Sequence, residues 1–189
     1  MIIGIPKEIK TGEQRVAMTP ANIEFLTAKG LQVLFQTDAG CAAGYPDAEY
    51  TAAGATLTTD RAEIFARADI ILQVQSFGSN NENSDADLAS LRSGQLIIGM
   101  MDPLASPAAA QAVADKGATA IALELVPRIS RAQSMDVLSS MATLAGYKAV
   151  LMGASAAPRI FPLLMTAAGT LQPARVLIMG VGVAGLQAC

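Results

Sequence analysis

Three glycines near the end of the chain have a spacing that can hold a pyrophosphate group. Gly180, Gly182 and Gly185 form a G-x-G-x-x-G pattern directly after the apolar run 175–179, which predicts a strand. In such a strand-to-helix turn the first glycine permits a tight bend, the second lets a phosphate approach the backbone, and the third lets the helix pack on the strand. The pattern predicts a dinucleotide site; the alternative is a packing turn in an α/β domain that binds no nucleotide.

The pattern does not determine which dinucleotide is bound. The acidic residue that contacts the ribose is expected about 20 positions after the turn, and that position lies beyond Cys189. The choice between NAD and NADP therefore has no determinant within the chain. We expect the chain to stop at the truncated start of a dinucleotide-binding domain.

A second group of polar side chains lies between apolar runs, from Arg128 to Ser140. The amide of Gln133 offers both a donor and an acceptor, which matches a primary carboxamide such as that of nicotinamide. Arg128 and Asp136 could pair and orient one another across such a site. The other interpretation is structural: Ser134 or Asp136 caps the following helix, and the arginines are solvated.

The sequence contains no histidine, and its two cysteines are Cys41 and Cys189. Without histidine, the commonest general acid or base of enzymes is missing. A zinc site usually draws on cysteine and histidine together, and two distant cysteines do not form a disulfide framework. We therefore expect no structural metal site.

Short apolar runs alternate with helical patterns along most of the chain. Pro20 and Pro107 predict the first turns of two helices, and Gly30 and Gly117 predict their ends. The pattern predicts an α/β fold with a parallel sheet flanked by helices, of the flavodoxin-like or Rossmann-like kind. The expected strands are 2–5, 31–35, 70–74, 96–100 and 119–123, and further helices are expected at 46–53, 61–68 and 84–92.

The pattern changes at about Met135, where a long helix is expected to begin. The apolar residues that can share one face of this helix are Val137, Leu138, Met141, Leu144, Ala145 and Ala149. Three prolines then predict an irregular connector with a short helix between 154 and 173. We expect three regions: an N-terminal α/β domain at 1–134, a linking helix and connector at 135–163, and the truncated start of a Rossmann domain at 164–189.

One segment, 76–85, is of low complexity. Its sequence, SFGSNNENSD, is rich in serine, asparagine and glycine. This composition predicts a mobile surface loop, and a contact with a partner is the alternative.

The composition limits the class of protein. Hydrophobic residues make up 52% of the chain and charged residues 15%, which predicts a buried core rather than disorder. The net charge is −3 and no basic stripe is present, so nucleic acid is not an expected partner. No continuous apolar run reaches the roughly 20 residues that cross a bilayer, and the N-terminus lacks the features of a signal peptide. We expect a cytoplasmic chain without a membrane span of its own.

Several motifs together resemble one family. Residues 127–136, PRISRAQSMD, are similar to the signature loop of the NAD(H)-binding component, or alpha subunit, of proton-translocating NAD(P) transhydrogenases. Residues 5–8 and 15–20 resemble the start of that family and of its relative, alanine dehydrogenase. Residues 165–170, 173–176 and the glycine pattern extend the resemblance over essentially the whole chain. The loop is the specific motif, whereas the start and the glycine pattern are shared more widely.

The resemblance implies hydride transfer from NADH to NADP⁺ held on a different domain, coupled to proton movement through a membrane domain. It implies NAD(H) as the cofactor, partners that bind NADP(H) and span the membrane, a homodimer, and a peripheral place at the inner face of the membrane. It implies catalytic roles for Arg128, Gln133 and Asp136. The residues that it places at the cofactor are Arg128, Ile129, Gln133, Ser134, Met135, Asp136, Ser139, Gly180, Gly182, Val183 and Gly185.

Two alternatives remain open. Alanine dehydrogenases resemble this chain at Arg15, their substrate-carboxylate arginine, but transfer protons with a lysine and a histidine. The lysine is expected near 72–75, where the sequence has Gln73 and Gln75, and the histidine near Met101 and Asp102. Transfer of a hydride directly between two nicotinamide rings moves no substrate proton and needs mainly orientation of the rings. The second alternative is a non-catalytic fragment that acts as a binding or assembly module.

Overall fold

The computed structural model describes residues 1–80, 82 and 84–189, which form two compact units. Unit 1 is Met1–Val126 and unit 2 is Pro127–Cys189.

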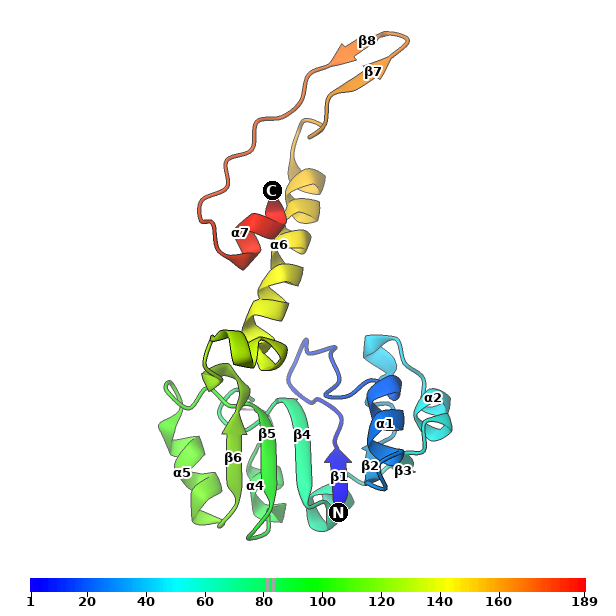
Figure 1. Ribbon diagram of the computed structural model, residues 1–189, viewed down its shortest axis with the longest axis vertical. Helices are drawn as coiled ribbons and strands as arrows, with labels where there is room; N and C mark the ends of the chain where they lie inside the picture. Colours follow the sequence, from blue (N-terminus) through cyan, green and yellow to red (C-terminus); the bar gives the residue numbers. More distant parts are fainter. Residues whose placement is uncertain (81, 83) are drawn as a thin grey trace. The chain divides into compact units, whose positions relative to one another are not determined.

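Unit 1 is built on a parallel sheet (Figure 1). Within the described residues the sheet has six strands in the order β3-β2-β1-β4-β5-β6, and every neighbouring pair is parallel. The predicted parallel α/β fold is confirmed, and one strand was not foreseen, because β3 has only three residues and shows no readable periodicity. The strands are β1 (Ile2–Ile5), β2 (Gln32–Gln36), β3 (Thr56–Thr58), β4 (Ile70–Gln75), β5 (Leu96–Met100) and β6 (Thr119–Ala122).

Helices cover both faces of this sheet. On one face Ile5 and Phe35 pack with Ile23 of α1 and Tyr50 of α2. The core of the other face contains residues of α3, α4 and α5, packed on Ile71 and Ile97 of the strands. The helices are α1 (Pro20–Thr27), α2 (Asp47–Ala52), α3 (Arg61–Arg67), α4 (Ser84–Ser90) and α5 (Pro107–Asp115), with 3-10 turns η1 (Cys41–Ala43) and η2 (Leu123–Leu125).

The strand order of the sheet changes direction between β1 and β4, since β1 pairs with both β2 and β4. In open α/β sheets this switch point lies where the connections that leave the carboxyl ends of neighbouring strands diverge. The segment that follows β1 meets the end of β4 here: the Glu8 carboxylate accepts hydrogen bonds from the N–H groups of Val74 and Gln75 at 2.6 and 3.1 Å. Lys10 donates to the carbonyl oxygen of Ser79 at 2.6 Å.

The segment 76–85 differs from the mobile surface loop that its composition predicts. Ser76, Phe77 and Asn80 are buried, and the Ser79 hydroxyl donates to the carbonyl oxygen of Met100 at 2.6 Å. Phe77 is one apolar residue among polar ones, and its burial in the core outweighs the polar character of its neighbours. Positions 81 and 83 of this segment lie outside the described residues.

Unit 2 begins with η3 (Ser130–Met135), a 3-10 segment that the sequence did not predict, and with α6 (Val137–Ala156), the long helix expected from about Met135. The next segment differs from the predicted connector with a short helix. Instead, β7 (Leu164–Thr166) and β8 (Gly169–Leu171) form an antiparallel hairpin. The Thr166 hydroxyl accepts a bond from the Ala168 N–H and donates to the Gly169 carbonyl oxygen, which stabilises the turn.

The strand expected at 175–179 is not formed; this described stretch has no regular secondary structure and no neighbouring strand. Apolar sequence alone does not make a strand, because its N–H and C=O groups need a paired partner. The predicted helix start after the glycines is confirmed, since α7 (Val183–Ala188) begins there.

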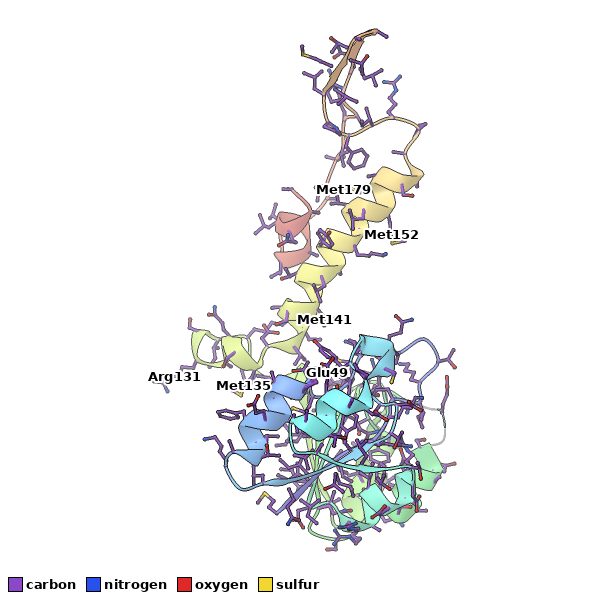
Figure 2. All side chains as sticks on the ribbon, turned by 90° about the vertical axis from the view of Figure 1, so that its right-hand side faces the viewer. Glu49, Arg131, Met135, Met141, Met152 and Met179 are labelled. Atoms are coloured by element: carbon purple, nitrogen blue, oxygen red, sulfur yellow. The ribbon has the colours of Figure 1, made fainter. Side chains whose placement is uncertain are left out.

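The side of α6 that is buried is not the predicted apolar face. α7 packs beside α6 (Figure 1), and Gly146 is the buried residue of α6, whereas Leu144 of the predicted face is 58% exposed. Figure 2 shows side chains standing out along α6, with Met141 and Met152 labelled. Of the predicted face, Val137, Leu138 and Met141 are half-buried, whereas Leu144, Ala145 and Ala149 are exposed.

One helix in the described residues of the chain, α6, is long and apolar enough to cross a membrane by length and composition alone. Its 18-residue window has a mean hydropathy of 1.2, and 6% of that window is buried. This candidate span was not predicted from the sequence, because Ser, Thr and Lys148 interrupt the apolar residues. A single such helix is weak support for a span.

Candidate functional site

A cavity of about 690 Å³ in unit 2 gathers most of the predicted loop residues. They come from η3 and the two residues before it, from Asp136 and the first two turns of α6, and from the start of α7. The lining residues are Arg128, Ile129, Ser130, Gln133, Asp136, Ser139, Ser140, Thr143 and Val183.

Asp136 fixes the start of α6 at the edge of this cavity. Its Oδ1 accepts a hydrogen bond from the Ser139 N–H at 2.9 Å, and its Oδ2 accepts one from the Ser139 hydroxyl at 2.6 Å. These bonds make Asp136 the N-cap of α6. They hold the pKa of Asp136 below its ordinary value, with a smaller contribution from the positive charge of Arg128. Asp136 is therefore a fixed negative charge that faces the cavity.

Arg128 and Gln133 keep their polar groups available to a ligand. The expected ion pair between Arg128 and Asp136 is not among those formed by the described residues, although Arg128 is near enough to affect the pKa of Asp136. Asp136 bonds to Ser139 instead, which satisfies its carboxylate locally. Both Arg128 and Gln133 are exposed, so a guanidinium and a carboxamide line one wall of the cavity.

The glycine turn is shaped by close backbone contacts. Gly180 has a φ of 111°, a conformation that other residues rarely adopt. A Cβ on Gly185 would overlap the carbonyl oxygen of Gly180. Gly182 is the N-cap residue of α7, and its carbonyl oxygen accepts from the Leu186 N–H at 2.9 Å. The turn has the tight bend predicted at Gly180 and open space at Gly182, and it leads into a helix, whereas the strand predicted before it is not formed.

The cavity unites some predicted site residues and leaves others out. Val183 is the one residue of the turn that lines it, whereas Gly180, Gly182 and Gly185 lie in the adjoining turn. Ser134 and the exposed Met135 belong to η3 but do not line this cavity of the described chain; Figure 2 labels Met135 and Arg131 on that segment.

Three lining residues were not among those predicted: Ser130, Ser140 and Thr143. Two of them could have been found from helix periodicity, because Ser140 and Thr143 follow Asp136 by four and seven residues and so share its side of α6. Ser130 carries no comparable signal.

Unit 1 holds a separate polar cluster at the switch point of its sheet. Glu13 and Arg15 form a bidentate ion pair, with Nε–Oε1 and Nη2–Oε2 distances of 2.8 and 2.6 Å. The Gln75 amide donates to Glu13 at 3.1 Å. These bonds, that of Arg15 first, lower the pKa of Glu13 to about 2. Burial is the main cause that raises the pKa of nearby Glu8.

One group in unit 1 has the composition of a metal site. Ligand atoms of Asp38, Cys41 and Asp47 lie within 4.8 Å of one another. Both Asp47 oxygens already accept the Asp38 N–H. Desolvation, followed by the Asp38 hydrogen bond, raises the pKa of Cys41, which opposes the thiolate form that binds metals. This arrangement gives no reason to assign a metal.

The sheet of unit 1 and the glycine turn of unit 2 define an α/β protein of the Rossmann-like class. Two family models match the chain: the alanine dehydrogenase/PNT N-terminal domain over residues 4–145, and the alanine dehydrogenase/PNT C-terminal domain over residues 149–189. The chain therefore belongs to the alanine dehydrogenase/PNT family.

Individual relatives agree with this assignment. The chain is 45% identical to an NAD(P) transhydrogenase subunit alpha protein of Rhodospirillum rubrum over 188 residues, which is 100% of this chain and 49% of that protein. A crystal structure of transhydrogenase from Sinorhizobium meliloti matches with a TM-score of 0.91 and 44% identity, covering 100% of this chain and 52% of that one. Alanine dehydrogenase of Mycobacterium tuberculosis is 36% identical, covering 100% and 49%. The chain thus spans about half the length of these relatives.

Proposed function

We propose that this chain contributes the nicotinamide end and the pyrophosphate turn of an NAD(H) site in a proton-translocating NAD(P) transhydrogenase. The observation that carries the proposal is the cavity in unit 2. It combines Arg128, Gln133 and Asp136 of the loop with Val183 of the glycine turn, and this proximity supports a single dinucleotide site.

The residues present fit NAD(H). The Gln133 amide can both donate to and accept from the nicotinamide carboxamide, and Arg128 and the fixed charge of Asp136 orient it. Ser139 holds Asp136 in place. Gly180, Gly182 and Gly185 leave the backbone N–H groups accessible to a pyrophosphate. Ile129, Ser134 and Met135 complete the set of residues assigned to the cofactor.

When bound, NADH supplies a hydride, and the chain's task is to place the ring. Hydride transfer to NADP⁺ on a partner domain moves no substrate proton in this site, so orientation and closeness are what the protein must provide. The side chains that line the cavity include amide, guanidinium, carboxylate and hydroxyl groups, and these are suited to orientation.

The partners follow from the same proposal. An NADP(H)-binding domain must approach the nicotinamide end of the cavity, and a membrane domain must couple the reaction to proton movement. We place the protein at the inner, cytoplasmic face of the membrane, attached through these partners, and expect it to work as a homodimer.

Alanine dehydrogenase activity is the second candidate, because Arg15 is present and the M. tuberculosis enzyme is a relative. That reaction needs groups that move protons. The lysine is expected near 72–75, where Gln73 is buried and accepts from the Ser76 hydroxyl at 3.0 Å, and Gln75 donates to Glu13 at 3.1 Å. The histidine is expected near Met101 and Asp102; Met101 is buried in the apolar core, and the Asp102 N–H donates to Glu124. Neither a lysine nor a histidine stands at the expected positions.

Hydride transfer in the natural gene product that contains this chain tests the proposal. Mixed with membranes that carry the partner subunits, it is expected to reduce a thio or acetylpyridine analogue of NAD(P), and to lose this activity without them. Reduction of NAD that depends on alanine would overturn the proposal in favour of the second candidate. The 189-residue chain alone is expected to bind NADH weakly, because it spans half of the relatives' length.

A further inference from the structure

Gly146 is the point at which α7 meets the backbone of α6. It is the buried residue of a helix whose described side chains are otherwise half-buried or exposed. A Cβ on Gly146 would overlap the carbonyl oxygen of Ala184 and lie 3.0 Å from its carbonyl carbon. Both atoms belong to the backbone, so rotation of a side chain cannot relieve the overlap. The two helices therefore touch here with no side chain between them.

This contact joins the two halves of the cavity. Ala184 belongs to the glycine turn, and its neighbour Val183 lines the cavity. Thr143, which lies about one helical turn before Gly146, lines the same cavity. The distance between the turn and the polar residues of α6 is thus set where Gly146 meets Ala184.

We propose that Gly146 is a positioning residue that fixes the distance between the glycine turn and the nicotinamide end of the cavity. This inference rests on the proposed NAD(H) site. A dinucleotide that reaches from the turn to Gln133 must match that distance, whereas a ligand held at the turn alone need not.

The size of the effect follows from packing. Non-bonded heavy atoms rest about 3.5 Å apart, so relieving the overlap needs a shift of roughly 1 Å. Shifts of this size at a binding site can change rates by up to about 100-fold. Glycine in the interior of a helix destabilises that helix relative to alanine. The close contact with Ala184 explains why glycine nevertheless stands in the middle of α6.

Gly153 provides a matched control on the same helix. A Cβ at Gly153 would meet only the Phe161 ring, at an ordinary contact distance of 3.7 Å. Gly146→Ala and Gly153→Ala make the same chemical change in the interior of α6 and raise helix propensity equally. Any difference between the two variants therefore reports the contact with Ala184.

The experiment uses the natural gene product and two probes, NADH and ADP-ribose. ADP-ribose carries the pyrophosphate but lacks the nicotinamide ring. We expect Gly146→Ala to raise the Kd for NADH about tenfold and the Kd for ADP-ribose less than about threefold. Gly153→Ala is expected to leave both values unchanged.

The ratio of the two Kd values separates positioning from folding. Partial unfolding raises the apparent Kd of both ligands by the same factor, so the ratio is independent of how much protein is folded. An unchanged ratio in Gly146→Ala overturns the positioning role. Failure of the unaltered protein to bind NADH overturns the proposed function instead.

Discussion

The carboxylate of Asp136 is held by both donors of Ser139, the backbone N–H at 2.9 Å and the hydroxyl at 2.6 Å. One residue thus caps α6 and presents a fixed negative charge to the cavity. The two tasks can be separated, because an uncharged Asn can still cap a helix.

Asp136→Ala is expected to lower both the thermal midpoint of the protein and its transhydrogenation rate. Asp136→Asn keeps an oxygen that accepts from the Ser139 N–H, so its thermal midpoint should change little. It loses the charge near Arg128 and should still reduce the hydride-transfer rate, by about tenfold. Circular dichroism melting and a hydride-transfer assay measure the two effects. If the hydride-transfer rate falls only where the thermal midpoint falls, in both variants, Asp136 serves only as the cap of α6.

Gln133→Leu tests the proposed contact with the nicotinamide carboxamide. Leu fills a similar volume without donor or acceptor, so the Kd for NADH should rise by roughly 5–10-fold, the value of about one hydrogen bond. The Kd for ADP-ribose should not change, because that ligand has no carboxamide. Gln172→Leu is the matched control, since Gln172 lies in unit 2 but lines a different cavity. If both substitutions change the Kd for NADH equally, Gln133 does not contact the nicotinamide carboxamide.

The sequence predicted those features that depend on local chemistry. Pro20 and Pro107 begin helices as expected, and the glycine turn opens α7 where its spacing places it. The parallel sheet followed from the alternation of apolar runs and helical patterns. Asp136 was one of two expected caps for the long helix, and it is the one that forms.

The sequence could not predict features that depend on distant partners. Residues 175–179 are apolar enough for a strand but have no neighbour with which to pair, and β3 exists because Leu34 to Gln36 pair with it. The buried side of α6 is centred on Gly146, because a backbone contact with Ala184 decides it rather than the apolar periodicity. Ser130 joins the cavity only through the path of η3.

The ion pair of Glu13 and Arg15 should make unit 1 sensitive to acid. The pKa of Glu13 falls from an ordinary 4.5 to about 2 in the folded chain. A lowered pKa in the folded state stabilises the protein above the unfolded value, and this stabilisation is lost as the pH falls through the folded value. The loss should therefore occur between pH 4.5 and about 2. The pKa of Glu8 is raised above its ordinary value of 4.5, so its effect on stability falls at pH values above 4.5 and outside this window.

Glu13→Gln is expected to flatten this region of the pH dependence. Gln has no proton to gain over the window, so the urea midpoint of the variant should fall less steeply between pH 4.5 and 2 than that of the unaltered chain. Urea unfolding at a series of pH values measures the slope. Identical slopes in the two proteins would show that other carboxylates cause the acid sensitivity.

The ion pair between Arg61 and Asp87 is expected to make the largest single contribution among those considered for unit 1. Arg61 donates to both Asp87 oxygens at 2.7 and 2.6 Å and to the Lys7 carbonyl oxygen at 2.6 Å. Asp87 is buried, so Arg61→Met leaves an unpaired buried charge and should cost about 3 kcal/mol of unfolding free energy.

The double variant Arg61→Met with Asp87→Leu removes both charges and should cost less than Arg61→Met alone. Arg67→Met, in the same helix but at an exposed pair, should change little. Urea unfolding compares the unaltered protein, Arg61→Met, Arg67→Met and the double variant, and a double variant less stable than Arg61→Met alone would contradict the expected cost of the unpaired buried charge.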